Sequence, residues 1–143
     1  MCYNLFVRSF YKVLVVDDEP DSLLFVAETL KKMGYEVVTA DTGELGLKKF
    51  YEEKPDLIIL DVLLPSLDGW EVLERIRADE RGRKTPVIML TVRGSNKDKL
   101  HGYIIGADYY LGKPFSLQAL LQAVNSVKEN LNKKTREQPP EEV

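Results

Sequence analysis

The chain has a single cysteine, Cys2, and no apolar run near the roughly 20 residues that a membrane-spanning helix needs. One cysteine excludes an internal disulfide and fits a reducing compartment. The apolar stretch before Lys12 is interrupted by Asn4, Arg8 and Ser9 and contains no secretory core. We therefore expect a cytoplasmic protein that makes no contact with a membrane.

Phosphate-binding glycine loops and a strong net charge are also missing. Neither a Walker loop nor a G-x-G-x-x-G fingerprint is present, which argues against a nucleotide-binding protein. A flavin-binding flavodoxin would need a phosphate-cradling loop after its first strand, where this chain carries acids. The net charge of −3 is small, so bulk electrostatics favour neither nucleic-acid nor membrane binding.

The chain does contain a regular alternation of strand-like and helix-like segments within its 143 residues. One of them, Leu57–Leu60, is apolar at every position, as in a strand buried on both faces of a parallel sheet. The predicted strands are Val13–Val16, Glu36–Thr39, Leu57–Leu60, Val87–Thr91 and Tyr109–Leu111. The predicted helices are a stretch containing Leu23, Ala27 and Leu30, then Glu44–Tyr51, Trp70–Ala78, a segment around Asn96–Ile105, and Ser116–Leu131.

Five strand–helix units with short loops predict one α/β domain with parallel strands. We expect a flavodoxin-like (βα)5 open sheet in the order 2-1-3-4-5 with helices on both faces. This domain should span residues 12–131. Residues 1–11 are an N-terminal extension whose role the sequence leaves open. The polar residues 132–143 are expected to form a disordered tail.

Polar residues stand at the predicted strand ends, where ligands bind in open α/β sheets. The first strand ends in Asp17 and Asp18, the third in Asp61, the fourth in Thr91, and Lys113 follows the fifth. Two like charges about 4 Å apart repel by roughly 4 kcal/mol at an effective dielectric near 20, so converging acids need a cation. Oxygen ligands without histidine or cysteine favour Mg²⁺. A carboxylate beside Mg²⁺ and a lysine can attack a phosphoryl group, which makes Asp61 the expected nucleophile.

Four segments carry a resemblance that covers about residues 12–131. They are VLVVDDEP at 13–20, PDLIILDVLLP at 55–65 with DG at 68–69, PVIMLT at 86–91, and GADYYLGKPF at 106–115. Each segment alone is a weak signal. Together, in this order and at the strand ends, they resemble the receiver domain of two-component response regulators.

The resemblance implies a role for each residue of the acidic site. Asp61 would accept a phosphoryl group from a sensor histidine kinase or a histidine phosphotransfer protein. Asp18 would bind Mg²⁺ directly and Asp17 through water, while the backbone carbonyl of Leu63 would complete the protein ligands. Lys113 would bind the phosphoryl oxygens.

The resemblance also implies a switch. Thr91 would move to hydrogen-bond the phosphoryl group, and Tyr110 would swing inward behind it. The face formed by the fourth helix, fifth strand and fifth helix would then change its preference for a downstream protein target or an output domain. A homodimer through this face is left open. The family pattern further suggests a cis bond before Pro114.

Three positions next to the site depart from the usual pattern or influence the attacking water. Val92 follows Thr91 where a smaller residue is usual, so access to the site should be narrower. Leu63 and Arg93 are predicted to modulate the lifetime of the phosphoryl group. Replacing both with alanine and timing dephosphorylation tests this, and an unchanged rate would remove the idea.

Two other functions stand beside the phosphoacceptor switch. An aspartate-nucleophile phosphatase would need a second acid two residues after the nucleophile, where this chain has Leu63. A receiver fragment of a longer DNA-binding response regulator is the other alternative. After Leu131 nothing resembles a helix-turn-helix, so we expect no direct contact between this chain and nucleic acid.

Overall fold

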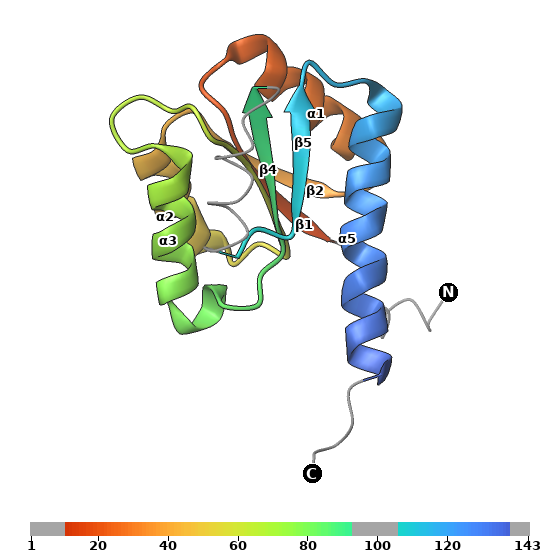
Figure 1. The fold of residues 1–143 in the computed structure, drawn as a ribbon. Coiled ribbons are helices and arrows are strands. Elements are labelled where there is room, and N and C mark those ends of the chain that lie inside the picture. Colours follow the sequence, from red (N-terminus) through yellow and green to blue (C-terminus); the bar gives the residue numbers. More distant parts are fainter. Residues whose placement is uncertain (1–10, 93–105, 138–143) are drawn as a thin grey trace.

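A five-stranded parallel sheet forms the centre of the protein (Figure 1). The computed structural model describes the backbone of residues 11–92 and 106–137 and the side chains of residues 11–92 and 106–129. The strand order is β2-β1-β3-β4-β5, which confirms the predicted flavodoxin-like arrangement. The strands are β1 (Lys12–Val16), β2 (Glu36–Ala40), β3 (Leu57–Asp61), β4 (Val87–Val92) and β5 (Tyr109–Lys113).

Helices cover both faces of this sheet, as predicted (Figure 1). Within the described residues they are α1 (Pro20–Lys32), α2 (Gly43–Glu53), α3 (Gly69–Ala78), the short 3-10 helix η2 (Glu80–Gly82) and α5 (Leu117–Glu137). The helix predicted around Asn96–Ile105 lies outside the described residues.

The position of β3 in the middle of the sheet explains why apolar and polar residues do not alternate in its sequence. Ile58 and Leu60 join the core under α2 and α3, whereas Leu57 and Ile59 join the core under α1 and α5. All four side chains have no exposed surface, because both faces of a central parallel strand are covered. Two cores therefore meet at β3 and hold it firmly in place.

The register of the sheet brings the acids of two neighbouring strands to one edge. Val16 of β1 lies opposite Leu60 of β3, so the residues that follow them, Asp17 and Asp61, stand at the same level. The loop after β3 is drawn tightly against this edge, since a Cβ atom on Gly69 would overlap the carbonyl oxygen of Asp61. Asp68 accepts a hydrogen bond from the backbone N–H of Glu71 (3.0 Å) and so caps α3 where the chain leaves the loop.

The end of α5 differs from the boundary drawn from the sequence. We predicted a disordered tail from residue 132, but the helix continues to Glu137. Residues 132–137 contain neither proline nor glycine, and the first residue that excludes a helix is Pro139, so the lack of apolar residues does not end it. Residues 1–10 and 138–143 lie outside the described part. Among the helices described, none is long and apolar enough to span a bilayer.

Candidate functional site

Three strand ends bring together two buried acids and one lysine. Side chains two residues apart on a strand point to the same face of the sheet. Asp61 therefore points to the same face as Ile59, and Lys113 to the same face as Leu111, which is the face covered by α1 and α5. Asp17 directly follows β1 and, two residues after Val15, points to the same face. Asp17 has no exposed surface and Asp61 is only 4% exposed. The site therefore lies in a low-dielectric edge of the core, where charges interact strongly.

Lys113 is the cation at the centre of this site. Its Nζ lies 2.9 Å from Oδ2 of Asp17, 3.1 Å from Oδ2 of Asp61 and 3.5 Å from Oε1 of Glu19. Backbone groups hold the opposite carboxylate oxygens: Glu19 N–H donates to Oδ1 of Asp17 (3.0 Å), and Leu63 N–H donates to Oδ1 of Asp61 (3.2 Å). Counted over residues 11–92 and 106–129, one positive charge thus faces three carboxylates, which is an excess of negative charge.

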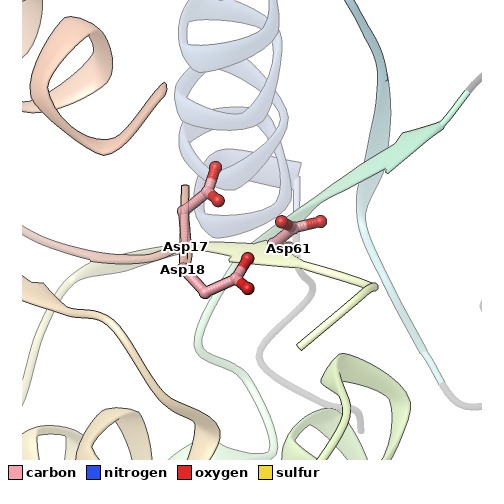
Figure 2. A group of neighbouring side chains, drawn as sticks. All are labelled: Asp17, Asp18 and Asp61. Carbon is pink, nitrogen blue, oxygen red and sulfur yellow. The ribbon is translucent and has the colours of Figure 1, made fainter. Parts of the chain in front are cut away.

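A fourth carboxylate, that of Asp18, completes a cluster able to hold a cation (Figure 2). Ligand oxygens of Asp17, Asp18 and Asp61 all lie within 4.8 Å of one another, and Asp18 is exposed to solvent. Oδ2 of Asp17 is buried and accepts no hydrogen bond, although Lys113 stands within ion-pair distance. Hard oxygen donors with negative charge in excess suit a small divalent cation such as Mg²⁺. The residues present therefore fit the ion that the sequence predicts.

The two buried acids differ in how firmly they hold a proton. Burial, followed by the neighbouring Asp17 carboxylate, raises the pKa of Asp61 to about 6 against the opposing effect of Lys113. Burial also acts to raise the pKa of Asp17, but the hydrogen bond from the Glu19 backbone and the adjacent Lys113 ammonium lower it overall. Although burial acts to lower the pKa of Lys113, its two carboxylate partners raise it. Lys113 thus stays charged, and Asp61 is the acid whose charge a cation would stabilise most.

The two predicted switch residues lie on the other face of the sheet. Met89 of β4 lies opposite Tyr110 of β5, and Thr91 is two residues beyond Met89, so Thr91 and Tyr110 point to the α2–α3 side. Thr91 is 5% exposed, and its hydroxyl donates to the Val92 carbonyl (3.2 Å). The Tyr110 ring packs against the core with its centroid 6.4 Å from that of Trp70. Thr91 follows Leu90, the partner of Asp61 in the sheet, whereas Tyr110 lies deeper, opposite Met89.

Exposed apolar side chains flank the buried acids. Leu63 is 62% exposed and Val92 is 55% exposed, each next to a residue of the site. The backbone of Leu63 already contacts Asp61, as described above. Arg93, predicted together with Leu63 to influence phosphoryl lifetime, lies outside the described residues.

Two features of the site were open or missed in the sequence. Glu19 directly follows the two acids, and the structure brings it to Lys113 while leaving its side chain exposed. Ser22 was missed; its hydroxyl helps to lower the pKa of Asp17. Its only signal was a hydroxyl in the first turn of the helix that follows the acids. The Lys113–Pro114 peptide bond is cis, as the family pattern suggests.

Comparisons with known proteins agree with this geometry. The family model for the response regulator receiver domain matches residues 13–125. Among curated proteins, the chain is 44% identical over 116 residues to the alkaline phosphatase synthesis transcriptional regulatory protein PhoP of Bacillus subtilis (strain 168), an alignment covering 81% of this chain and 48% of PhoP. The chain spans about half the length of the curated relatives it matches.

Solved structures show the same likeness over nearly their whole length. The chemotaxis response regulator CheY4 of Vibrio cholerae superposes with a TM-score of 0.79 at 37% identity, covering 82% of this chain and 98% of CheY4. The receiver domain of a sensor histidine kinase from Pseudomonas aeruginosa PAO1 gives a TM-score of 0.74 at 30% identity, covering 81% of this chain and 95% of that one. That structure holds a magnesium ion coordinated in its active-site cleft.

Proposed function

The chain belongs to the response regulator receiver domain family, and from this premise we propose that Asp61 is its phosphoacceptor. The donor would be the phosphohistidine of a sensor histidine kinase or of a histidine phosphotransfer protein. The observation that carries the proposal is the setting of Asp61: a buried carboxylate 3.1 Å from Lys113 Nζ, within a cluster of three acids. Neither a nucleotide nor a diffusible substrate is required by this arrangement.

The transfer balances without a separate general base. A carboxylate oxygen of Asp61 attacks phosphorus, and the P–N bond to the donor imidazole breaks with its electron pair left on nitrogen. The imidazole then takes a proton from solvent. Water later attacks the phosphorus of the acyl phosphate, which releases inorganic phosphate and restores the carboxylate. With a pKa of about 6, Asp61 is largely ionised at neutral pH and can act as the nucleophile.

The acidic cluster would hold Mg²⁺ through Asp18 and Asp61 directly, Asp17 through water, and the carbonyl of Leu63. When bound, the ion supplies neutralisation of the charge on the phosphoryl oxygens. The oxygen-only donor set and the magnesium-containing Pseudomonas receiver both support this choice of ion. Lys113, already 2.9–3.1 Å from two of the carboxylates, would bind a phosphoryl oxygen as the second positive charge.

The signal would leave the site through Thr91 and Tyr110. Phosphorylation stabilises one of two arrangements by differential contacts, here the Thr91 hydroxyl on the phosphoryl group and Tyr110 turned inward behind it. β5 and α5 would form part of the face that a downstream target or an output domain reads. A homodimer through this face remains a prediction, as does the cytoplasmic location that a kinase partner and the single cysteine support.

A second function is favoured by one observation, the half-length alignment with curated transcriptional regulators. In this reading the chain is the receiver of a DNA-binding response regulator, and its partner is an output domain of the same protein. The chemistry at Asp61 is the same in both cases. The full reading frame decides between them, because an output domain after residue 143 would show it directly.

Intact-mass measurement tests the phosphoacceptor. The protein is incubated with acetyl phosphate and Mg²⁺, and we expect a mass gain of one phosphoryl group that vanishes without metal. Asp61→Asn should show no gain, while Glu80→Gln, an exposed acid in η2 at the opposite edge of the sheet, should behave as wild type. A wild-type protein that gains no phosphoryl group from acetyl phosphate or from a kinase would sink the proposal and indicate a phosphorylation-independent receiver.

A further inference from the structure

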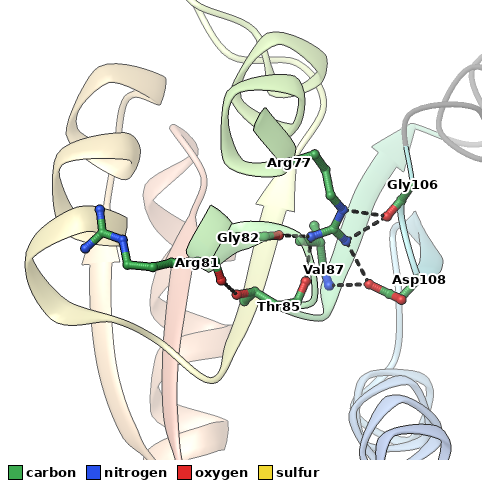
Figure 3. A network of polar contacts seen from close by, with 7 residues as sticks. All are labelled: Arg77, Arg81, Gly82, Thr85, Val87, Gly106 and Asp108. Atoms are coloured by element: carbon green, nitrogen blue, oxygen red, sulfur yellow. Dashed lines mark hydrogen bonds and ion pairs between the residues drawn. The ribbon is translucent and has the colours of Figure 1, made fainter. Parts of the chain in front are cut away.

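Outside the acidic site, the described side chain with the most hydrogen bonds is a partly buried arginine at the opposite edge of the sheet (Figure 3). Arg77 lies in the last turn of α3 with 15% of its side chain exposed. Its Nη1 donates to the carbonyls of Gly82 and Thr85 (2.7 Å each), and its Nε (3.0 Å) and Nη2 (2.7 Å) both donate to the carbonyl of Gly106. Nη2 also donates to the carboxylate of Asp108 (3.0 Å). One guanidinium thus joins the end of α3, the loop before β4 and the turn before β5.

The turn before β5 is shaped to fit this guanidinium. Gly106 has φ 111°, and a Cβ atom added there would lie 3.2 Å from Nε of Arg77. The Asp108 carboxylate that contacts Arg77 also accepts from the backbone N–H of Val87 (2.8 Å), and Asp108 N–H donates to the Val87 carbonyl (2.9 Å). These bonds pair the first residues of β4 and β5, and Arg77 ties that pair to α3.

The same helix holds β5 at a second point. Trp70 and Arg77 are seven residues apart, so they lie on one face of α3, about two turns from each other. Trp70 contacts the Tyr110 ring at 6.4 Å between centroids, whereas Arg77 contacts Gly106 and Asp108 through directed hydrogen bonds. The aromatic contact tolerates a change of ring position, but the forked hydrogen bonds do not. The end near the acidic site is therefore adjustable, and the far end is fixed.

We propose that Arg77 is a positioning residue for the switch: by fixing Gly106 and Asp108 against α3, it sets where Tyr110 stands relative to Trp70. Asp108 directly precedes β5 and Tyr110 is the second residue of that strand, so a shift of Asp108 would move Tyr110 as well. Without this fixed end, the phosphoryl state of Asp61 would bias the position of Tyr110 less strongly. The inference rests on the proposed function, since it concerns how that phosphorylation is read out.

The fluorescence of Trp70, the only tryptophan of the chain, tests this role. Wild type, Arg77→Gln and Asp108→Asn are treated with acetyl phosphate and Mg²⁺ at a temperature where circular dichroism shows each to be folded. Fluorescence change and phosphorylated fraction are measured on the same sample. We expect normal phosphorylation, but about a twofold or larger loss of fluorescence change per phosphorylated molecule in both variants. Arg81→Gln is the matched control, because Arg81 is half exposed and contacts Asp79 instead.

Each outcome decides the inference. A purely structural Arg77 would lower the unfolding temperature of the variants and leave the fluorescence change per phosphorylated molecule at the wild-type value, which would overturn the proposal. If Arg77→Gln does not fold, Arg77→Lys and Asp108→Asn carry the test, because each keeps a polar group in place. A wild type that is phosphorylated without any Trp70 response would overturn the positioning role alone. A wild type that cannot be phosphorylated would overturn the proposed function and this inference together.

Discussion

The two edges of the sheet differ in how completely their charges are balanced. At the acidic edge, Lys113 is the one cation among the described residues that faces the carboxylates of Asp17, Asp61 and Glu19. At the far edge, the donors of Arg77 are taken up by backbone carbonyls and one carboxylate, so its charge and its hydrogen bonds are both satisfied. The fold alone therefore accounts for the far edge, whereas the acidic edge keeps unbalanced negative charge, as expected of a site built to take a cation.

Removing the cation of each edge should have the largest effect and should separate the two edges by their response to Mg²⁺. Lys113→Met leaves two buried acids without their cation, and Arg77→Met leaves a carboxylate and three carbonyls without their donor. We expect each to lower the free energy of unfolding by about 3–5 kcal/mol without metal. Added Mg²⁺ should raise the free energy of unfolding of Lys113→Met by more than it raises that of wild type. The reason is that a site with more negative charge binds the ion more tightly.

Urea unfolding with and without Mg²⁺ measures this difference. At about 100 times its dissociation constant, a ligand of the folded state adds about 2.7 kcal/mol to the stability. In Arg77→Met the gain from Mg²⁺ should equal that of wild type, since the ion does not reach the far edge. Equal gains from Mg²⁺ in both variants would show that the two edges do not differ in the way described here.

The pH dependence of the metal-free protein should be the next largest effect. The pKa of Asp61 is about 6 in the fold and 3.8 ordinarily, so the folded state holds this proton more tightly than the unfolded state. Stability from this group is therefore fully present below pH 3.8 and is lost as the pH rises through 6. The shift corresponds to at most about 3 kcal/mol. Asp17, whose pKa is lowered, acts in the opposite sense and at lower pH.

Thermal unfolding between pH 4.5 and 7.5 (about one and a half units either side of the Asp61 pKa) provides the measurement. We expect wild type without metal to become less stable across this range, and Asp61→Asn to lack most of that slope. Mg²⁺ should also remove it, because the ion keeps Asp61 ionised in the folded state. Glu80→Gln, far from the acidic edge, serves as the control and should keep the wild-type slope. A slope that persists in Asp61→Asn would assign it to another group.

The fold and the members of the acidic site were predictable because their signals are local. The fully apolar stretch of β3 identifies a buried central strand, and the acids at the ends of β1 and β3 mark the edge of the sheet where the site lies. Neither inference needs any knowledge of distant contacts. The difference in pKa between Asp17 and Asp61 was not predictable from the sequence. It depends on three-dimensional details: the Glu19 backbone N–H bonds Asp17, whereas Asp61 is buried beside the Asp17 carboxylate.

The far edge could not be predicted for a related reason. Arg77 reaches a carbonyl 29 residues away, and backbone carbonyls leave no trace in the identity of a residue. An arginine in the last turn of α3 equally suits a solvated helix end, where the macrodipole favours it. The predicted end of α5 was too early for another reason: six polar residues without proline or glycine can extend a helix that is already anchored by its packing.

Backbone strain gives the smallest of the expected differences between the edges. Each edge carries a residue in the left-handed region: Gly106 at the far edge (φ 111°) and Ser66 in the loop after β3 (φ 68°). Glycine adopts this region without penalty, but serine does not, and the Ser66 hydroxyl is held by the carboxylate of Glu44 at 2.8 Å. At the acidic edge, strain therefore lies in the loop next to Asp61, where residues in unusual conformations often serve function. At the far edge, the strained non-glycine residue is Lys54 (φ 50°), the C-cap of α2.

Three substitutions measure this strain by urea unfolding. Gly106→Ala should destabilise by about 1 kcal/mol or more, because alanine is strained there and its Cβ would approach Arg77. Ser66→Ala and Ser66→Gly both lose the bond to Glu44, so the difference between them isolates the strain. Ser66→Gly should be the more stable of the two by about 1 kcal/mol. If it also accepts the phosphoryl group from acetyl phosphate more slowly than Ser66→Ala, the strained loop helps to hold Asp61 for reaction; equal rates would mean that the strain is confined to the loop.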